Sequence, residues 1–491
     1  MMLKKILPLC VLLMLLGGVF LSSCRKETLD TDTTSKLEFS TDTVYFDTVF
    51  VTFGSTTQRF KVFNRSEKKI KISRIRLAGG NSSPFRLNID GESADEVTDI
   101  EIDGQDSIFV FAEVTIDPNN EQNPFVVLDS VLFETNGNEQ KVTLMAYGRN
   151  ADFFRPTVFP SNGFPAYSVV DCNSTWTKDR PKVIIGYLAV DSACTLTIEA
   201  GTQVYLYNNS GLWVYKQGKL VVNGTLQDSV VFQGVRKEDS YKNTPGQWDR
   251  IWINQGSTGN VINYAVIKNA NIGIQAEDVF QFGDAPTSLL TLTNTRIKNM
   301  KAYGIYGVHY NINAWNNVIS NCGSYAMALI NGGTYRFRHN TIANYWGESV
   351  RTETAVFLSN YQATSTVTYV ADMDFRFTNG IVYGNLQSDN ELEVDSQTGA
   401  AFNWKFENSL LKVNNENIDN SDASHFSSIT FNEAPGFRNN TSDYRLTESA
   451  SARNKGSVTV VNESPAIPTD LLGNNRLSDS APDCGAMEYT P

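Results

Sequence analysis

The sequence predicts an all-β chain in which a β-sandwich is followed by a parallel β-helix. Two observations predict this order. Short segments of alternating apolar and polar residues fill residues 37–150, and residues 261–413 contain six segments in which the same residue types recur in the same columns. Helical periodicity is absent from both regions, so an α-solenoid is not expected.

The chain begins with a sequence typical of a lipoprotein signal peptide, residues 1–23. Lys4 and Lys5 precede an apolar run over residues 6–20, and two serines stand directly before Cys24. We expect cleavage before Cys24 and lipidation of its thiol, because several acyl chains together anchor a protein stably to a membrane. Residues 24–36 are polar and predict a tether to the folded part.

The three residues after Cys24, Arg25-Lys26-Glu27, resemble the charged surface-export signals of Bacteroidetes lipoproteins. The resemblance implies a cell-envelope protein that is lipid-anchored to the outer membrane. It does not decide whether the protein is exposed at the cell surface. The membrane is then one partner, reached through the anchor.

Net charge and cysteine spacing exclude two classes of ligand. The formal charge is −12, and it becomes −14 when cleavage of the signal peptide removes Lys4 and Lys5. A negative net charge argues against nucleic acid as a ligand. Beyond Cys10 and Cys24 the cysteines are Cys172, Cys194, Cys322 and Cys484, with no CxxC pair, so we expect neither a metal site nor a cofactor. Cys172 and Cys194 are either a disulfide or two free thiols. The state of Cys322 and Cys484 is not assigned.

The first folded unit is expected over residues 37–150. Apolar and polar residues alternate at 43–50, 59–63, 70–75, 107–114 and 142–147, which indicates about seven short strands in a sandwich. The stretches 63–72, 77–80, 102–107, 117–118 and 144–148 resemble immunoglobulin-like modules of the ASPM/SPD-2/Hydin type. The resemblance implies a spacer or interaction domain without an active site.

The six repeated segments align on one column of aliphatic residues, Ile267, Ile297, Ile319, Ile342, Val382 and Leu411. Five positions upstream of these stand Ile262, Leu292, Ala314, Phe337, Phe377 and Phe406. Because side chains alternate faces along a strand, both columns are expected to face inward in stacked coils.

Asparagine recurs in two further columns. The predicted amide ladder consists of Asn294, Asn316, His339, Asn379 and Asn408, three positions upstream of the aliphatic column, and of Asn269, Asn299, Asn321 and Asn344, two positions downstream. Coils about 4.8 Å apart allow such amides to hydrogen-bond each other, and asparagine also tolerates the left-handed backbone of a tight corner. The alternative is ordinary turn residues between unrelated strands.

Both ends of the second unit resemble right-handed parallel β-helix proteins of Bacteroidetes. Residues 195–202, 218–225, 230–234 and 246–252 resemble the entry coils of that family. Asp470, Gly473, Arg476, Asp483 and residues 485–489 resemble its closing peptide, which in the family packs against the last coils. We expect a proline-rich linker at residues 151–165 and the β-helix with its closing segment at 166–491.

The outward columns carry the candidate ligand contacts. Trp315, Arg336, Arg338, Arg376 and Lys405 are expected to project from one face. Guanidinium groups bind carboxylate or sulfate, and an indole offers an apolar platform for a sugar. The alternative is a solvated surface in which these cations pair with Asp372, Asp374 and Glu407. No stacked aspartate pair appears in these columns, which argues against an inverting glycosidase.

The sequence therefore predicts an envelope lipoprotein whose β-helix binds carbohydrate, in particular acidic polysaccharide, without an assigned catalytic residue. A polysaccharide lyase acting on uronate-containing glycans is the enzymatic alternative. A structural adhesin or scaffold is the third hypothesis.

Overall fold

The computed structural model describes residues 28–50, 54–117, 125–161, 163–238, 241–278, 285–414 and 418–491. Contacts divide the chain into two compact units, Met1–Asn150 and Ala151–Pro491. The predicted signal peptide and Cys24 lie outside the described residues. Within the described part of the chain, no helix combines the length and the apolar character that a membrane span needs.

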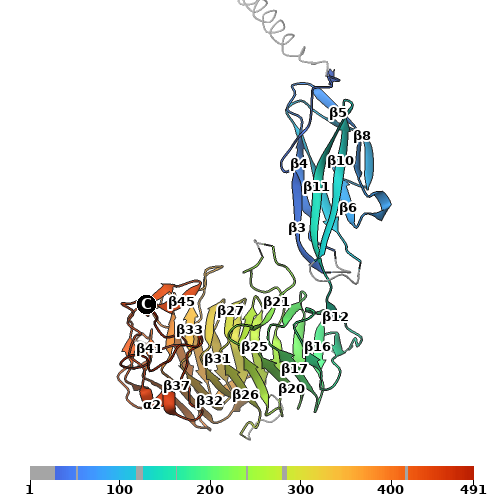
Figure 1. Ribbon diagram of the computed structural model, residues 1–491. Helices are drawn as coiled ribbons and strands as arrows, with labels where there is room; N and C mark the ends of the chain where they lie inside the picture. Colours follow the sequence, from blue (N-terminus) through green and yellow to red (C-terminus); the bar gives the residue numbers. More distant parts are fainter. Residues whose placement is uncertain are drawn as a thin grey trace, which may run out of the picture. The chain divides into compact units, whose positions relative to one another are not determined.

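The first unit is an immunoglobulin-like β-sandwich of two sheets (Figure 1). One sheet has the order β1-β5-β10-β11-β3, with β8 paired to β5, and the other has the order β2-β4-β9-β6-β7. The strands are β1 Leu29–Asp30, β2 Glu38–Phe39, β3 Thr43–Phe50, β4 Gln58–Phe63, β5 Lys69–Leu77, β6 Phe85–Ile89, β7 Glu92–Ser93, β8 Glu96–Ile102, β9 Ser107–Val114, β10 Phe125–Thr135 and β11 Asn138–Arg149. Alternate residues of these strands are buried between the sheets, among them Phe60, Ile72 and Phe133.

The structure corrects the tether predicted at residues 24–36, because part of it belongs to the sandwich. β1 pairs in parallel with β5. The carboxylate of Asp30 accepts hydrogen bonds from Ser66 Oγ at 2.8 Å and Ser35 Oγ at 2.9 Å. These local bonds order the segment although it lacks apolar periodicity.

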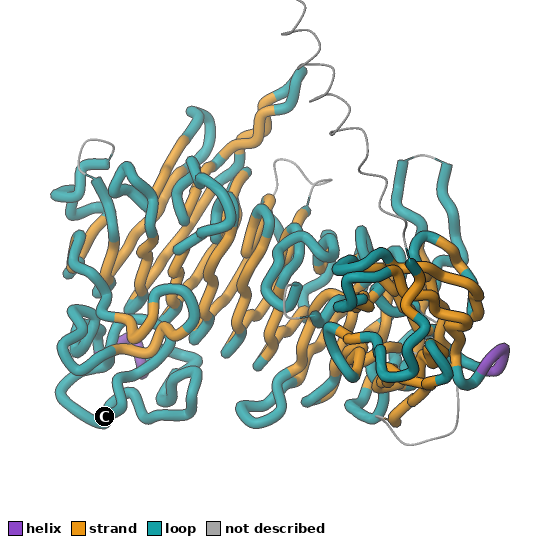
Figure 2. Tube along the Cα trace, turned by 90° about the horizontal axis from the view of Figure 1, so that it is seen from above, coloured by secondary structure: helices purple, strands orange, loops and turns teal. Residues whose placement is uncertain are grey.

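The second unit is a right-handed parallel β-helix whose coils contribute strands to three sheets, except that the last coils, from β41 on, have no strand in the second sheet (Figure 2). Sheet 1 consists of β12 Asp152–Phe154, β15 Lys182–Ile184, β18 Gln203–Leu206, β21 Val230–Gly234, β24 Ala265–Lys268, β27 Arg296–Met300, β30 Val318–Cys322, β33 Thr341–Asn344, β38 Ile381–Gly384, β41 Leu410–Leu411 and β43 Thr430–Phe431.

Sheet 2 consists of β13 Tyr167–Val169, β16 Tyr187–Val190, β19 Gly211–Val214, β22 Ile251–Ile253, β25 Ile272–Glu277, β28 Tyr303–Val308, β31 Met327–Ile330, β34 Val356–Ser359 and β39 Leu392–Asp395. Sheet 3 consists of β14 Thr175–Trp176, β17 Thr195–Glu199, β20 Lys219–Asn223, β23 Asn260–Asn263, β26 Leu289–Thr293, β29 Asn311–Trp315, β32 Gly333–Arg338, β37 Met373–Thr378, β40 Phe402–Glu407 and β42 Phe426–Ser427.

The register between coils is the one that the aligned columns predict. In sheet 1 the aliphatic column pairs step by step from Ile267 to Leu411. In sheet 3 the second column pairs from Ile262 to Phe406 in the same way. Both columns lie in one continuous buried core, so each coil completes the apolar surface of the next.

The segment 151–165, predicted as a linker, contains the first strand of the β-helix. β12 pairs with β15 and opens sheet 1. Phe154 stacks on Trp176 with ring centroids 5.0 Å apart. The strand forms because this ring covers the core of the first coil, so the β-helix begins at Asp152 and not at residue 166.

Residues 436–491, the closing segment, cover the outer side of sheet 1 and reach the outer face of sheet 3 at residues 463–465. This segment includes the hairpin β44 Phe437–Asn439 and β45 Asp443–Leu446 and the short helix α2 Val458–Asn462. Its apolar residues pack on the outward side chains Val318, Ala343, Ile381 and Leu410, which belong to four consecutive coils. Figure 1 shows α2 beside β32 and β37. The closing segment therefore packs on several of the last coils, in agreement with the resemblance.

Buried charges fix the closing segment to the coils. Arg476 is fully buried and forms an ion pair with Glu488. Its Nη2 also donates to Asn316 Oδ1 at 2.7 Å, across 160 positions of the sequence. The carboxylate of Asp470 accepts the backbone N–H groups of Leu472, Asn474 and Glu488. The polar residues that resemble the closing peptide thus satisfy one another inside the protein.

Candidate functional site

The predicted ligand contacts lie on the outer face of sheet 3, on four consecutive strands. Trp315 pairs with Arg338 and Arg336 pairs with Arg376, which in turn pairs with Lys405. Their neighbours in each strand, such as Phe337 and Phe377, are buried in the core. The alternation that packs the core therefore turns all five predicted side chains outward.

Four of the five residues line one depression of about 390 Å³. Its walls are Thr291, Asn313, Trp315, Arg336, Phe337, Arg338, Arg376 and Thr378 from sheet 3, and Glu463, Ser464 and Pro465 from the closing segment. Lys405 is not part of the lining. The closing segment makes the site concave, because a sheet face alone would be open.

Two arginines of the depression are paired with acids of the same sheet. Arg336 forms an ion pair with Asp374, and Arg376 Nε lies 2.5 Å from Glu407 Oε2. The hydrogen bond from Arg376 to Glu407 raises the pKa of Arg376. Lys405 Nζ lies 3.6 Å from the second oxygen of Glu407. Arg336 and Arg376 are thus paired with local acids, as the alternative hypothesis stated, and Lys405 shares Glu407 with Arg376.

Arg338 differs from these three cations. Its Nη1 donates to the carbonyl of Glu463 at 2.9 Å, and its guanidinium carbon lies 5.6 Å from the centroid of the Trp315 ring. Among the described residues it makes no ion pair. Burial lowers the pKa of Arg338, and the charge of Glu463 opposes this shift. A half-buried guanidinium beside an indole can donate hydrogen bonds to a ligand that lies against the ring.

The depression combines an indole ring with cations and their carboxylate partners. Its ionisable lining is three arginines and Glu463, with Asp374 and Glu407 as partners. Within the part of the chain that the structure describes, no group of three His, Cys, Asp or Glu residues could hold a metal ion.

The upstream column of the predicted amide ladder lies at the corner between sheets 3 and 1. Asn294, Asn316, His339, Asn379 and Asn408 all have positive φ, between 47° and 57°. The left-handed backbone accounts for asparagine at this corner. Asn316 Nδ2 donates to Asn294 Oδ1 at 2.9 Å, and Asn379 Nδ2 lies 3.1 Å from His339 Nε2.

The side chains of Asn316 and Asn379 turn toward the closing segment, because the positive φ at these positions breaks the alternation of the strand. Asn316 Nδ2 also donates to the carbonyl of Thr469, and Asn379 Nδ2 donates to that of Ser457. Asn316 and Asn379 are buried under the closing segment, whereas Asn294 and Asn408 are half-buried.

The downstream column forms a looser ladder. Asn299 Nδ2 donates to Asn269 Oδ1, and Asn321 Nδ2 donates to Asn299 Oδ1, each at 3.4 Å. Asn344 departs from the pattern, because its Oδ1 accepts the backbone N–H of Cys322 at 2.7 Å from inside the coil.

Sequence reasoning missed a ladder one residue after the corner. Asn317 and Asn340 are fully buried, and Asn317 Nδ2 donates to Asn340 Oδ1 at 2.9 Å. The Oδ1 of Asn317 accepts the N–H of Thr295, and that of Asn340 accepts the N–H of Asn317. The recurrence of small or polar residues two positions before the aliphatic column was the available signal.

Aromatic rows on the outer face of sheet 2 were also missed. Trp213 stacks between Phe164 and Trp252, with centroid distances of 5.9 and 5.1 Å. A second row contains Tyr303, Tyr306, Tyr325 and Phe357. Because the rings stack on one another, the faces between them are covered and the rows stabilise the coils, while Phe164 at the end of the first row is exposed.

The four cysteines of the described residues are one disulfide pair and two free thiols. Cys172 and Cys194 form a disulfide that closes a loop of the first coils. Cys322 and Cys484 are free and fully buried, and burial raises the pKa of both thiols. These two thiols are therefore unreactive core residues.

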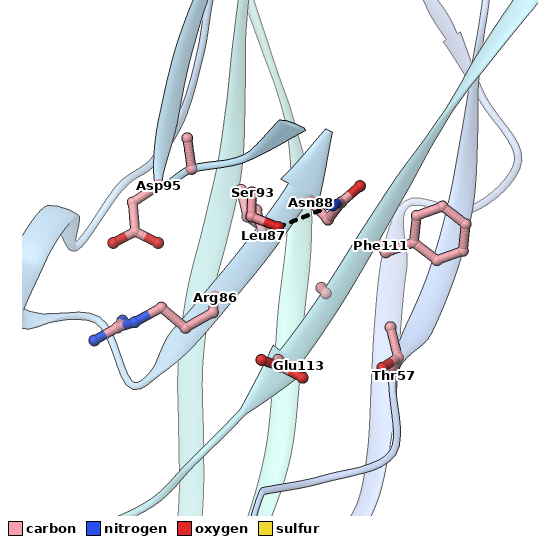
Figure 3. Close-up of a pocket in the computed structure, with 10 residues that line it drawn as sticks. Thr57, Arg86, Leu87, Asn88, Ser93, Asp95, Phe111 and Glu113 are labelled. Atoms are coloured by element: carbon pink, nitrogen blue, oxygen red, sulfur yellow. Dashed lines mark hydrogen bonds between the residues drawn. The ribbon is translucent and has the colours of Figure 1, made fainter. Parts of the chain in front are cut away.

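The sandwich has an open pocket of about 470 Å³ on the outer face of β6 and β9 (Figure 3). Arg86, Asn88, Phe111 and Glu113 contribute to its lining. Arg86 Nη1 donates to the carbonyls of Ser83 and Phe85, both at 2.7 Å. Figure 3 shows Arg86 directed away from Asn88 and Phe111, so the polar groups do not converge on one point.

Comparison with known proteins finds a family model that matches part of the second unit. A family model described as "Right handed beta helix region" matches residues 187–342, less than half of the chain. No curated protein matches. Three solved structures resemble the chain at low identity: an ASH / PapD-like domain of human CEP192 (8% identity, 27% of this chain and 97% of that one, TM-score 0.18), a family 123 glycoside hydrolase from Clostridium perfringens (7%, 24% and 28%, TM-score 0.18) and the periplasmic chaperone SfaE (12%, 23% and 58%, TM-score 0.17). At these TM-scores none of the three indicates a function. Residues 187–342 are thus similar to right-handed β-helix regions.

Proposed function

We propose that the protein is a lipid-anchored component of the cell envelope whose β-helix binds carbohydrate in the depression on sheet 3. The observation that carries the proposal is the pairing of Trp315 with Arg338 inside a concave site. Right-handed β-helices serve carbohydrate-related and structural roles, and the fold alone does not decide between these two roles.

The ion pairs refine the ligand class toward uncharged sugars. An acidic glycan would have to displace Asp374 from Arg336 or Glu407 from Arg376 before it could bind these guanidinium groups. A neutral saccharide needs no displacement, because its hydroxyl groups can donate to the carboxylates and accept from the arginines. The ion pairs of Arg336 and Arg376 therefore favour neutral sugar units at these two positions, whereas Arg338 stays available to an acidic group.

A glycan array followed by calorimetry on the intact protein tests the proposal. Trp315→Ala and Arg338→Ala are each expected to weaken binding of the selected saccharide by about tenfold, equivalent to about 1.4 kcal/mol. Arg59→Ala is the matched control, because Arg59 also lies over an aromatic ring, 5.4 Å from the Phe109 centroid, but in the sandwich.

Three outcomes separate the alternatives. Binding that weakens steeply with salt would favour an acidic glycan, and new unsaturated ends on the bound polymer would establish a lyase. If no saccharide binds, or both depression variants bind like the wild type, the proposal is wrong and the scaffold hypothesis gains.

A further inference from the structure

A second concave site lies on the outer face of sheet 1, where three cations occupy neighbouring positions. Lys268 pairs with Lys298 between β24 and β27, and Arg296 lies two residues before Lys298 on the same face. All three are half-buried. Like charges on adjacent strands repel, so this arrangement costs stability unless an anion compensates it.

Among the described residues the charge of Asp470 acts on Arg296 and opposes the lowering of its pKa, but no carboxylate lies within ion-pair distance of any of the three cations. Lys268, Arg296 and Lys298 make no ion pair with any described residue. Burial lowers the pKa of each, and the charge of Lys298 lowers that of Lys268 further. In contrast, Arg445 at the same place is paired with Asp443 by contacts of 2.6–3.1 Å.

The closing segment turns this face into a pocket of about 250 Å³. Its lining is Arg296, Lys298, Val318 and Ser320 from sheet 1, and Ser442, Asp443, Tyr444, Arg445, Leu472 and Met487 from the closing segment. Asp443 is held by Arg445, so the pocket keeps an excess of two positive charges. This excess occurs in a chain whose net charge is −12.

We propose that Arg296 and Lys298 form a binding site for an oxyanion, which is a sulfate, phosphate or carboxylate group, free or carried by a saccharide. The guanidinium of Arg296 offers planar paired donors, and the ammonium of Lys298 adds a point charge. Hydroxyl groups of Ser320 and Ser442 border the same space. The site is separate from the depression on sheet 3 and does not depend on the function proposed for it.

The test is calorimetry of the intact protein with sodium sulfate, sodium phosphate, glucuronate and a sulfated oligosaccharide, with a neutral oligosaccharide as the blank. At least one oxyanion is expected to bind, and Arg296→Gln with Lys298→Gln is expected to weaken it by about tenfold or more. Lys219→Gln, at an exposed lysine on sheet 3, is the matched control for loss of charge. Binding of the inorganic anions identifies a free ion, whereas binding of the sulfated oligosaccharide alone identifies a saccharide.

Thermal melting keeps the test independent of folding failure. Without anion, the double variant is expected to melt at or above the wild-type temperature, because it removes uncompensated half-buried charges. The anion is then expected to raise the melting temperature of the wild type but not that of the variant. The proposal is overturned if none of the four anions binds, or if Lys219→Gln weakens binding as much as the double variant.

Discussion

Buried amides join consecutive coils at the corner between sheets 3 and 1. Asn317 and Asn340 are fully buried and bond to each other and to the backbone of the neighbouring coil. Removing one partner leaves a buried donor or acceptor unsatisfied, which costs about 1–3 kcal/mol. Their positions explain why asparagine recurs in these coils beyond the needs of a turn.

Asn317→Ala and Asn316→Ala are expected to lower the free energy of unfolding by about 1–3 kcal/mol. Asn321→Ala is expected to cost less, because its bonds of 3.4 and 3.1 Å are longer and one is exposed to solvent. Urea unfolding of the three variants measures the difference. If the free energies of unfolding of all three variants equal that of the wild type, the role of the buried amides is refuted.

His339 occupies the same corner column as four asparagines, and it is fully buried. Burial lowers its pKa well below 6.5, and the charges of Arg476 and Arg338 lower it further. Below pH 6.5 the unfolded chain binds a proton that the folded protein does not, so His339 makes stability fall as the pH drops.

His339→Asn is therefore expected to reduce the loss of stability on the acid side of pH 6.5. The measurement is the melting temperature of wild type and variant as a function of pH, below and above 6.5. Above pH 6.5, the melting temperatures of the two proteins are expected to change with pH in parallel. An unchanged acid slope in the variant would show that other groups account for the acid sensitivity.

At the scale of elements, the closing segment depends on one buried ion pair. Arg476 bonds to Glu488, Asn316 and the carbonyl of Gly485. Arg476→Gln leaves Glu488 buried without its cation, and breaking such a pair costs about 3–5 kcal/mol.

Limited proteolysis checks this prediction. Cleavage within residues 436–491 is expected to be faster in Arg476→Gln than in wild type, while the coils stay resistant. Arg438→Gln is the matched control, because Arg438 is exposed and donates only to the carbonyl of Thr490. Equal cleavage of both variants would contradict the role assigned to the ion pair.

The elements themselves were largely predictable from the sequence, whereas the sites were not. Period-two alternation placed the strands, and the aligned columns gave the register from Ile267 to Leu411. The sequence offered the pairing of Arg336 with a local acid only as an alternative to ligand binding, because side-chain geometry decides between the two. The walls around Arg338 and Lys298 come from the closing segment, more than 100 residues away, and no local pattern predicts such a contact.

At the scale of the whole molecule, the proposed anchor is the feature that would hold the protein in the envelope. Cys24→Ser is expected to release the protein from membranes, because lipidation requires the thiol. Fractionation of cells that express wild type and variant measures this. A serine variant that sediments with the outer membrane as completely as the wild type would exclude the lipid anchor.

The closing segment also limits how this β-helix can change its length. In a simple solenoid a coil can be gained or lost at little cost, because each coil contacts only its neighbours. Here a single stretch of chain contacts Asn316, Thr341, Asn379 and Asn408 at spacings set by the intervening coils. Deleting or duplicating one coil between Asn316 and Asn408 would displace every later contact by one strand spacing. The number of coils in this region is therefore fixed by the tail, and growth or shortening of the β-helix is confined to the coils before it.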